Sequence, residues 1–375
     1  MHPFRLNIVT VTLQIDHYSK EQTAILKGIG ILLIVLHNFF HNLTPVIGEN
    51  EFSFSDEIFW NFYQTLLASP ENVLKAVFSY FGHYGVQVFI FLSSYGLSRK
   101  YHQKQLVIRP FLASRVNKIY CSFLLCVAVY ILLGLVKAHL MPGEKVLYWD
   151  SLLWKVLLVS NFIPGQALMP VGPWWFMPFI FQLYALYPWL LSRYQKHDYK
   201  FLILVSLTAI LVESQINSYL ISRHLNLNHT VFGYLPLVCL GIFFAAQDKI
   251  KIPVLYGVIA LLLFVLGNFN SYAWILGNIA LTIVALAASS TLFRFLLRYT
   301  YTARLLVFFG AISFHLFMVN GFLRTPFHYV AESYHRWWID DLAALASLLF
   351  STLFAYCLSR LDDKLRAVFA HPHKP

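Results

Sequence analysis

Charged residues are scarce in this chain. Only 12% of its 375 residues are Asp, Glu, Lys or Arg, whereas 58% are hydrophobic and the mean hydropathy is +0.62. In a typical soluble domain about a quarter of the residues are charged, and so few charges could not cover a soluble core of this size. The composition excludes an ordinary soluble domain and indicates an integral membrane protein.

Cysteine is also scarce. The four cysteines all lie within apolar runs, without the paired spacing of a metal site or the density of a disulfide scaffold. We interpret them as packing residues and predict no metal site. The first 20 residues lack the basic-then-apolar order of a cleavable signal peptide. The first apolar run is therefore expected to act as an uncleaved signal.

Long apolar runs, in contrast, are abundant. A helix needs roughly 20 apolar residues to cross the hydrocarbon core of a membrane. Ten runs with few or no charges are predicted as spans, and they cover residues 28–44, 81–98, 116–136, 173–192, 201–221, 231–247, 252–268, 273–293, 305–323 and 342–359. An eleventh run, 151–163, is short and is followed by a segment with proline and glycine, so it is predicted to be interfacial or re-entrant.

The basic residues predict the orientation of these spans. If the N-terminus is cytoplasmic, three quarters of the 28 Lys and Arg residues lie in cytoplasmic segments, as the positive-inside rule requires. Counting the eleventh run as a span would reverse the rest of the chain. We therefore predict an all-α polytopic membrane protein with about ten transmembrane helices, both termini cytoplasmic and a single domain over 1–375. Basic loops facing anionic lipid account for the net charge of +11 without any nucleic acid.

The first run, LKGIGILLIVLHNFFHNL (26–43), carries ionisable side chains at membrane depth. Lys27 stands at its start, His37 lies about 15 Å further along the helix axis, and His41 shares a face with His37 at i+4. Asn38 and Asn42 form a second i, i+4 pair. Such residues are costly in lipid and usually face a bundle interior or a cavity.

Imidazole commonly takes a proton from a hydroxyl group near neutral pH. His37 and His41 are therefore candidate bases. The alternatives are a position at the membrane interface for His41 and a snorkelling anchor for Lys27.

Other polar residues form two further groups. Arg99, Arg115 and Lys118 lie at predicted cytoplasmic ends of spans, where guanidinium groups could bind phosphate or, alternatively, lipid headgroups. Glu213 lies near the outer end of its span, and a local ion pair with Arg223 or His224 is the alternative to a functional role. The Trp and Tyr residues of GPWWFMPFIFQLYALYP (172–188) are typical of an interfacial aromatic belt.

Five stretches of the chain carry a resemblance to a known family. They are LKGIGILLIVLHNFF (26–40), GVQVFIFLSSYGLSRKY (85–101), FLASRVNKIY (111–120), WWFMPFIFQLYALYPWL (174–190) and ISFHLFMVNGFL (312–323). In this order they resemble the integral-membrane acyltransferases called acyltransferase family 3, which include bacterial polysaccharide O-acetyltransferases. The resemblance covers most of the chain, about residues 24–360.

The resemblance implies transfer of an acyl group, commonly acetyl, in the bacterial cytoplasmic membrane. The donor would be cytoplasmic acyl-CoA as a co-substrate, with no permanently bound cofactor. The acceptor would be a hydroxyl of a cell-envelope or exported glycan or of a lipid-linked sugar. The sequence favours neither a particular acceptor nor a particular acyl chain.

The resemblance also assigns candidate roles. The family's essential pair is a basic residue and a histidine in the first helix, which makes Lys27 and a histidine the catalytic candidates. The family usually has ten residues between the two, whereas nine separate Lys27 from His37. Strict alignment therefore places Asn38 at the histidine position, with His37 about 100° away around the helix. His37 is preferred as the base and His41 is the reserve.

Further departures from the family pattern are Asn320, where many relatives have histidine, and Ser94, where glycine usually follows the residue equivalent to Ser93. The proposed phosphate-binding residues for CoA are Lys27, Arg99, Arg115 and Lys118. The substrate-binding candidates are Asn38, Ser93, Trp174, Tyr184, Glu213 and Asn320. Direct transfer is preferred to a relay through Ser93.

Three other functions compete with the acyltransferase. A transporter or flippase of a lipid-linked sugar could use the histidines as proton relays, but it would be expected to show internal repeats. A glycan polymerase would be expected to have a larger outer loop than 45–80. A degenerate relative could bind substrates without catalysis.

Overall fold

The computed structural model describes residues 12–141, 146–247 and 249–370. Its regular elements are β1 (Thr12–Ile15), α1 (Lys20–Phe40), α2 (Asp56–Ala68), η1 (Pro70–Asn72), α3 (Val73–Phe81), η2 (Gly82–Tyr84), α4 (Gly85–Tyr101), α5 (Ile108–Arg115), η3 (Val116–Tyr120), α6 (Cys121–Leu140), α7 (Trp149–Val156), η4 (Ser160–Phe162), η5 (Gly172–Trp175), α8 (Phe176–His197), α9 (Tyr199–Ser222), η6 (Leu227–His229), η7 (Val231–Tyr234), α10 (Leu235–Ala246), β2 (Ile250–Pro253), α11 (Val254–Leu266), α12 (Ser271–Ile275), α13 (Gly277–Leu296), α14 (Thr300–Leu323), α15 (Thr325–Tyr334) and α16 (Trp337–Ala370).

Each of the ten predicted spans coincides with one of these helices or with a continuous run of them. By length and composition, seven helical stretches in the described part of the chain can cross a membrane: Lys20–Phe40, Pro70–Tyr101, Ile108–Leu140, Tyr199–Ser222, Gly277–Leu296, Thr300–Leu323 and Trp337–Val368. Helix α8 and the shorter apolar helices Val231–Ala246 and Val254–Leu266 occupy the other three predicted ranges. The fold is thus a helical, multi-pass membrane fold, while the count of ten and the sides of the termini stay predictions.

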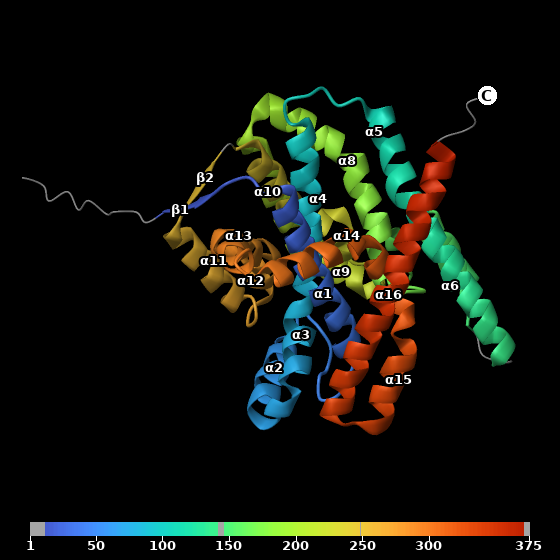
Figure 1. The fold of residues 1–375 in the computed structure, drawn as a ribbon. Helices are drawn as coiled ribbons and strands as arrows, with labels where there is room; N and C mark the ends of the chain where they lie inside the picture. The colour runs from blue at the N-terminus through green and yellow to red at the C-terminus, as the bar shows by residue number, and fades with distance from the viewer. Residues whose placement is uncertain (1–11, 142–145, 248, 371–375) are drawn as a thin grey trace, which may run out of the picture.

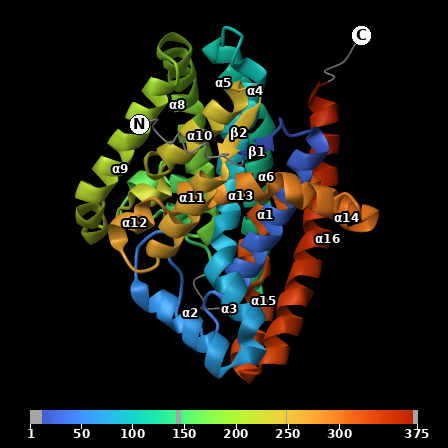
Figure 2. The ribbon, with the colours of Figure 1, turned by 90° about the vertical axis from the view of Figure 1, so that its left-hand side faces the viewer.

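Helix α1 lies among the other long helices. It packs against α14, α4, α3 and α16, and α4 and α14 in turn pack against α10 and α16. Figures 1 and 2 show α2, α3 and α15 gathered at one end of the bundle, and α5 at the opposite end. We call these the α2 end and the α5 end. Helix α1 runs from the α5 end toward the α2 end (Figure 1), and His37 in its last turn contacts the Ser79 carbonyl of α3.

Two short elements refine the sequence-based picture. Helix α7 has only eight residues, too few to cross a membrane, and it occupies the run predicted to be interfacial. Strands β1 and β2 form a small antiparallel sheet in which Gln14 pairs with Lys251. The all-α prediction missed this sheet because four-residue strands are too short to show an alternating pattern.

Several helices extend beyond their predicted ranges because charged residues are paired inside the bundle. The second span was predicted to begin at residue 81, but its helical stretch begins at Pro70. It includes Lys75, which is only 3% exposed and forms an ion pair with Asp340 of α16. At the far end of α16, Asp362 accepts hydrogen bonds from Ser122 of α6 and Arg366.

Candidate active site

The last turn of α1 places two imidazoles side by side. His37 is 2% exposed, and its Nδ1 lies 2.9 Å from the backbone carbonyl oxygen of Ser79. Because a carbonyl only accepts, Nδ1 of His37 carries a proton and donates it to this carbonyl. The ring of His41 stacks on that of His37 at 4.9 Å between centroids, and its Nδ1 donates to the His37 carbonyl at 2.9 Å.

Glu49 completes this pair. It comes from the loop between α1 and α2, and its carboxylate contacts Nε2 of His37. Burial alone would raise the pKa of Glu49, but the neighbouring His37 imidazole outweighs this and holds the pKa below its usual value. Glu49 is therefore a carboxylate at neutral pH. It is placed to stabilise the imidazolium that forms when His37 takes up a proton.

His41 has a different electrostatic environment. Its Nδ1 donates to the His37 carbonyl, and its Nε2 accepts a hydrogen bond from the side-chain amide of Asn42 at 3.0 Å. A ring with one donating and one accepting nitrogen is neutral. Nε2 of His41 is thus a proton acceptor, whereas Nε2 of His37 faces the Glu49 carboxylate.

Arg324 and His83 lie close to the two histidines and Glu49. Arg324 follows α14, and its charge acts on both Glu49 and His41. Burial lowers the pKa of Arg324 only to about 10, so it stays positively charged at neutral pH. Its Nη1 has no hydrogen-bond partner among the described residues. His83, at the junction of α3 and α4, packs edge-on against His37 at 5.5 Å between ring centroids.

The two asparagines at positions where the family commonly has histidine contact each other. The Asn38 side-chain amide donates to the Asn320 side-chain oxygen at 3.1 Å, and the Asn320 amide donates to the Phe317 carbonyl at 2.7 Å. Asn38 therefore faces α14, while His37 faces α3 and the Glu49 loop. The rotation of about 100° between neighbouring helix positions moves the imidazole to another side of α1, where it meets a carboxylate.

The same residues could hold a metal ion. One nitrogen of His37, one of His41 and one carboxylate oxygen of Glu49 all lie within 4.8 Å of one another. Two imidazoles and a carboxylate are a ligand set that zinc accepts, and the carbonyl partners of both Nδ1 atoms would orient the rings for it. The absence of a metal site therefore stays a prediction.

A second group of buried polar residues approaches Glu49 from the loops around α7 and α10. Glu51 is buried, and burial together with the charge of Glu49 raises its pKa well above the usual value. The charge of Glu49 also acts on His229, whose Nε2 has no hydrogen-bond partner in the described part of the chain. Lys155 lies beside His229, is completely buried, and donates to the Ala167 carbonyl at 2.5 Å.

Glu213 lies in the outer part of α9 and is 6% exposed. Its carboxylate accepts a hydrogen bond from Asn228 at 3.0 Å. Arg223 instead lies over the ring of Tyr219, 5.5 Å from its centroid. Glu213 is therefore part of the buried polar structure around η6 and is not held by the arginine that follows its helix.

The predicted phosphate-binding residues gather toward the α5 end of the bundle. Lys27 of α1 lies near enough to Lys118 of η3 for the charge of Lys118 to act on it. The Arg115 guanidinium lies 5.7 Å from the ring centroid of Tyr184. Arg99, at the end of α4, donates to the Ala245 carbonyl at 3.2 Å. Lys27 is thus placed with this basic group and not beside His37.

Two other sequence candidates have mainly structural surroundings. Trp174 is completely buried, and its indole N–H donates to the Met318 carbonyl at 2.8 Å. Ser93 is half-buried in α4. Its neighbour Ser94 faces Gly241 of α10 at a distance that leaves no room for a side chain at position 241.

Sequence reasoning missed Glu49, Arg324, Lys155 and His229. Glu49 is one of five acidic residues in the loop 45–80, and Arg324 and Lys155 are basic residues outside the ten predicted spans. Nothing in their spacing distinguishes them from solvated charges. Their burial against one another arises from segments that are distant in the chain.

Comparison with known proteins supplies the family. A family model described as an acyltransferase domain, that of acyltransferase family 3, matches residues 24–360. Neither the curated proteins nor the solved structures gave a match. The match covers nearly the whole chain, including the histidine pair, the basic residues of the α5 end and at least part of each of the seven candidate spans. The chain belongs to acyltransferase family 3 and is a multi-pass membrane acyltransferase.

Proposed function

We propose that this enzyme transfers an acetyl group from cytoplasmic acetyl-CoA to a hydroxyl of a cell-envelope or exported glycan. The observation that carries the proposal is the contact of His37 with Glu49 at one end of α1, with Lys27 toward the other end. This places a proton acceptor and a phosphate-binding group at different depths of one bundle. We place the enzyme in the bacterial cytoplasmic membrane, with ten spans and the α5 end on the cytoplasmic side.

Basic residues of the α5 end would hold the donor. The phosphate groups of CoA favour guanidinium and ammonium partners, and Lys27, Arg99, Arg115 and Lys118 supply them. The pantetheine arm would then extend along α1 toward the α2 end. Such an arrangement brings a cytoplasmic thioester to an acceptor on the other side without moving the whole donor across the membrane.

The transfer step uses the histidine pair. The acceptor hydroxyl takes the place of the Glu49 carboxylate at Nε2 of His37 and gives its proton to this nitrogen, while the hydroxyl oxygen attacks the thioester carbonyl carbon. Glu49 stabilises the imidazolium. The unpartnered Nη1 of Arg324 is suited to stabilise the oxyanion. The carbon–sulfur bond then breaks, and the CoA thiolate recovers the proton from His37, giving an ester and free CoA.

Replacing the histidines tests this proposal. We expect His37→Gln to lower transfer of radiolabelled acetyl groups by about 10²–10⁴-fold, the usual contribution of a general base. His41→Gln shows whether the neighbouring imidazole shares the task. His139→Gln is the matched control, because His139 is exposed on α6. Wild-type rates in both site variants would exclude a histidine base, and the absence of transfer by the wild type to any glycan would contradict the proposed function.

The donor end has a separate test. Arg115→Gln and Lys118→Gln remove positive charge beside Lys27 and are expected to raise the KM for acetyl-CoA more than they lower kcat. Lys104→Gln is the control, because this exposed lysine lies in the turn between α4 and α5. An unchanged KM for acetyl-CoA in both variants would place the donor site elsewhere.

A further inference from the structure

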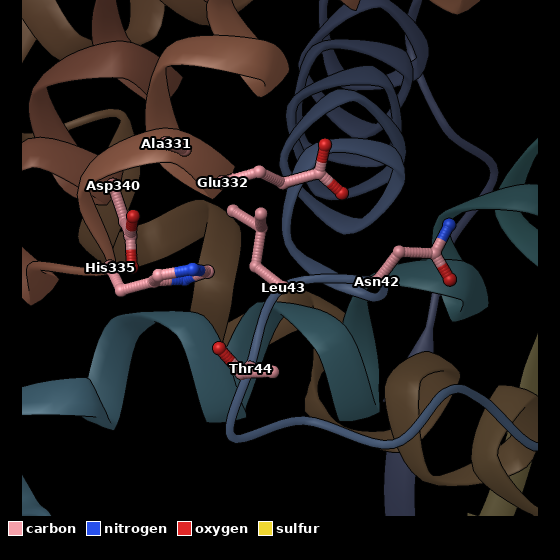
Figure 3. Close-up of a pocket in the computed structure, with 7 residues that line it drawn as sticks. All are labelled: Asn42, Leu43, Thr44, Ala331, Glu332, His335 and Asp340. Atoms are coloured by element: carbon pink, nitrogen blue, oxygen red, sulfur yellow. The ribbon is translucent and has the colours of Figure 1, made fainter.

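An open pocket of about 290 Å³ lies at the α2 end, directly beyond the histidine pair. It is formed by the residues that follow α1, the end of α15 and the start of α16. Figure 3 shows Asn42 on one side, Asp340 and His335 on the other, and Leu43, Thr44 and Glu332 between them. Its volume is close to the lower end of the range of about 300–1,000 Å³ that small-molecule sites occupy.

The pocket contains a buried polar atom without a partner. Asp340 is 3% exposed, and its Oδ2 forms the ion pair with Lys75 at 2.5 Å. Its other oxygen, Oδ1, has no hydrogen-bond partner within the described residues. A buried acceptor of this kind costs free energy unless a donor satisfies it, so the pocket is suited to a ligand that carries O–H or N–H groups.

Lys75 connects two walls of the pocket. Besides the ion pair, its Nζ donates to the backbone carbonyl of Thr44 at 2.5 Å. One buried ammonium thus fixes the loop after α1 to the first turn of α16. The pocket wall is therefore set by contacts among α1, α3 and α16.

Asn42 links the pocket to the active site. This residue lines the pocket, and its amide donates to Nε2 of His41, which stacks on His37. A ligand bound in the pocket would therefore be separated from the imidazole of His41 by the side chain of one residue. The side chain of Asn42 would be its first contact with the catalytic residues.

The charge of the lining residues selects among ligands. Two carboxylates, Asp340 and Glu332, line the pocket, and its described lining contains neither lysine nor arginine. Lys75 is already paired with Asp340, so the lining offers neither lysine nor arginine to the phosphates of an acyl-CoA. Carboxylate, amide, imidazole and hydroxyl groups together are suited to a neutral ligand rich in hydroxyl groups.

We propose that this pocket is the acceptor subsite and that it binds a neutral sugar unit of the glycan through its hydroxyl groups. The inference rests on the proposed function and adds the place and chemical class of the acceptor. The bound sugar donates hydroxyl groups to Asp340 and Glu332, and a further hydroxyl reaches past Asn42 to the histidine pair. The donor approaches the same histidines from the α5 end.

The test compares acceptor and donor kinetics in one set of variants. The probes are radiolabelled acetyl-CoA with tetrasaccharides of glucose and of N-acetylglucosamine. Thr44→Phe fills the pocket from an exposed position, and Glu332→Gln removes one charge with little change in shape. The controls are Thr302→Phe and Glu71→Gln, at exposed positions outside the pocket.

We expect Thr44→Phe to raise the KM for the acceptor tetrasaccharide by tenfold or more, and Glu332→Gln by roughly tenfold, the effect of losing one hydrogen bond to a ligand. The KM for acetyl-CoA and the controls should stay at wild-type values. Transfer with an unchanged acceptor KM in both variants would overturn the subsite and leave the proposed function standing. Absence of transfer by the wild type to either tetrasaccharide would overturn a neutral-sugar acceptor for this enzyme.

Discussion

At the residue scale, the burial of Lys155 changes the pH at which its side chain loses a proton. It is completely buried, its ammonium donates to one backbone carbonyl, and burial lowers its pKa from 10.5 to about 7. Between these two pH values the unfolded chain binds a proton that the folded protein releases. The free energy of unfolding should therefore rise as the pH is raised from 7 to 10.5.

Thermal unfolding in detergent at several pH values checks this expectation. Lys155→Met should remove much of the rise in unfolding temperature, because methionine fills the same space without a charge. Lys196→Met, at an exposed position, should keep the wild-type dependence. If both variants follow the wild type, the ammonium of Lys155 is hydrated and the buried position is wrong.

The same scale explains which site residues could be predicted. His37 and His41 stand out in the sequence because imidazoles at i and i+4 are conspicuous in an apolar helix. Glu49 and Arg324 do not, since acidic loops and basic span ends are ordinary on a membrane protein. Their roles depend on a loop that folds back over α1 and on the end of a helix far along the chain, which no local spacing encodes.

At the element scale, the seam between α1 and α14 depends on two glycines. A Cβ at Gly28 would lie 2.0 Å from the Leu306 carbonyl oxygen, and one at Gly310 would lie 2.1 Å from that of Ala24. Both obstacles are backbone atoms, so the helices would have to separate. Gly28→Ala and Gly310→Ala should each destabilise the protein by about 1–3 kcal/mol, the usual cost of overpacking.

Gly96 of α4 is the matched control. A Cβ there meets no atom within 4 Å, and Gly96→Ala should be neutral or stabilising by about 0.5–1 kcal/mol, because alanine favours helix over glycine. Thermal unfolding of the three variants measures the difference. Equal stability of all three would show that α1 and α14 pack less closely than the structure has them.

The existence of the helices was easier to predict than their lengths. Apolar runs identify a span, but a charge within the run was taken as its end, as with Lys75. The helical stretch continues through Lys75 because Asp340 neutralises it from α16, at 265 positions' separation in the chain. A charge in an apolar run indicates that burial in lipid would be unfavourable. The sequence does not show that a distant residue pairs with this charge.

At the scale of the whole molecule, the proposed reaction requires the α5 end of the bundle to face the cytoplasm and the α2 end to face the opposite side of the membrane. Ten spans put the α5 end in the cytoplasm and the α2 end outside. If the run 151–163 were an additional span, every later segment would change sides. The eight residues of α7 argue against this, and labelling of single cysteines can test it.

Six exposed positions report the two arrangements, in a background whose four native cysteines are replaced by alanine. With ten spans, an impermeant thiol reagent applied to intact cells should label cysteine at Glu71, Arg223 and Arg336 but reach Lys104, Lys196 and Arg298 only after permeabilisation. With an eleventh span, Glu71 and Lys104 would keep their sides while the other four positions exchange theirs. That exchange would invert α14 and α16 in the membrane relative to α1. Such an inversion is incompatible with the packing of α1 against both helices. Retention of acyl transfer in each single-cysteine variant would show that the labelled protein is the folded enzyme.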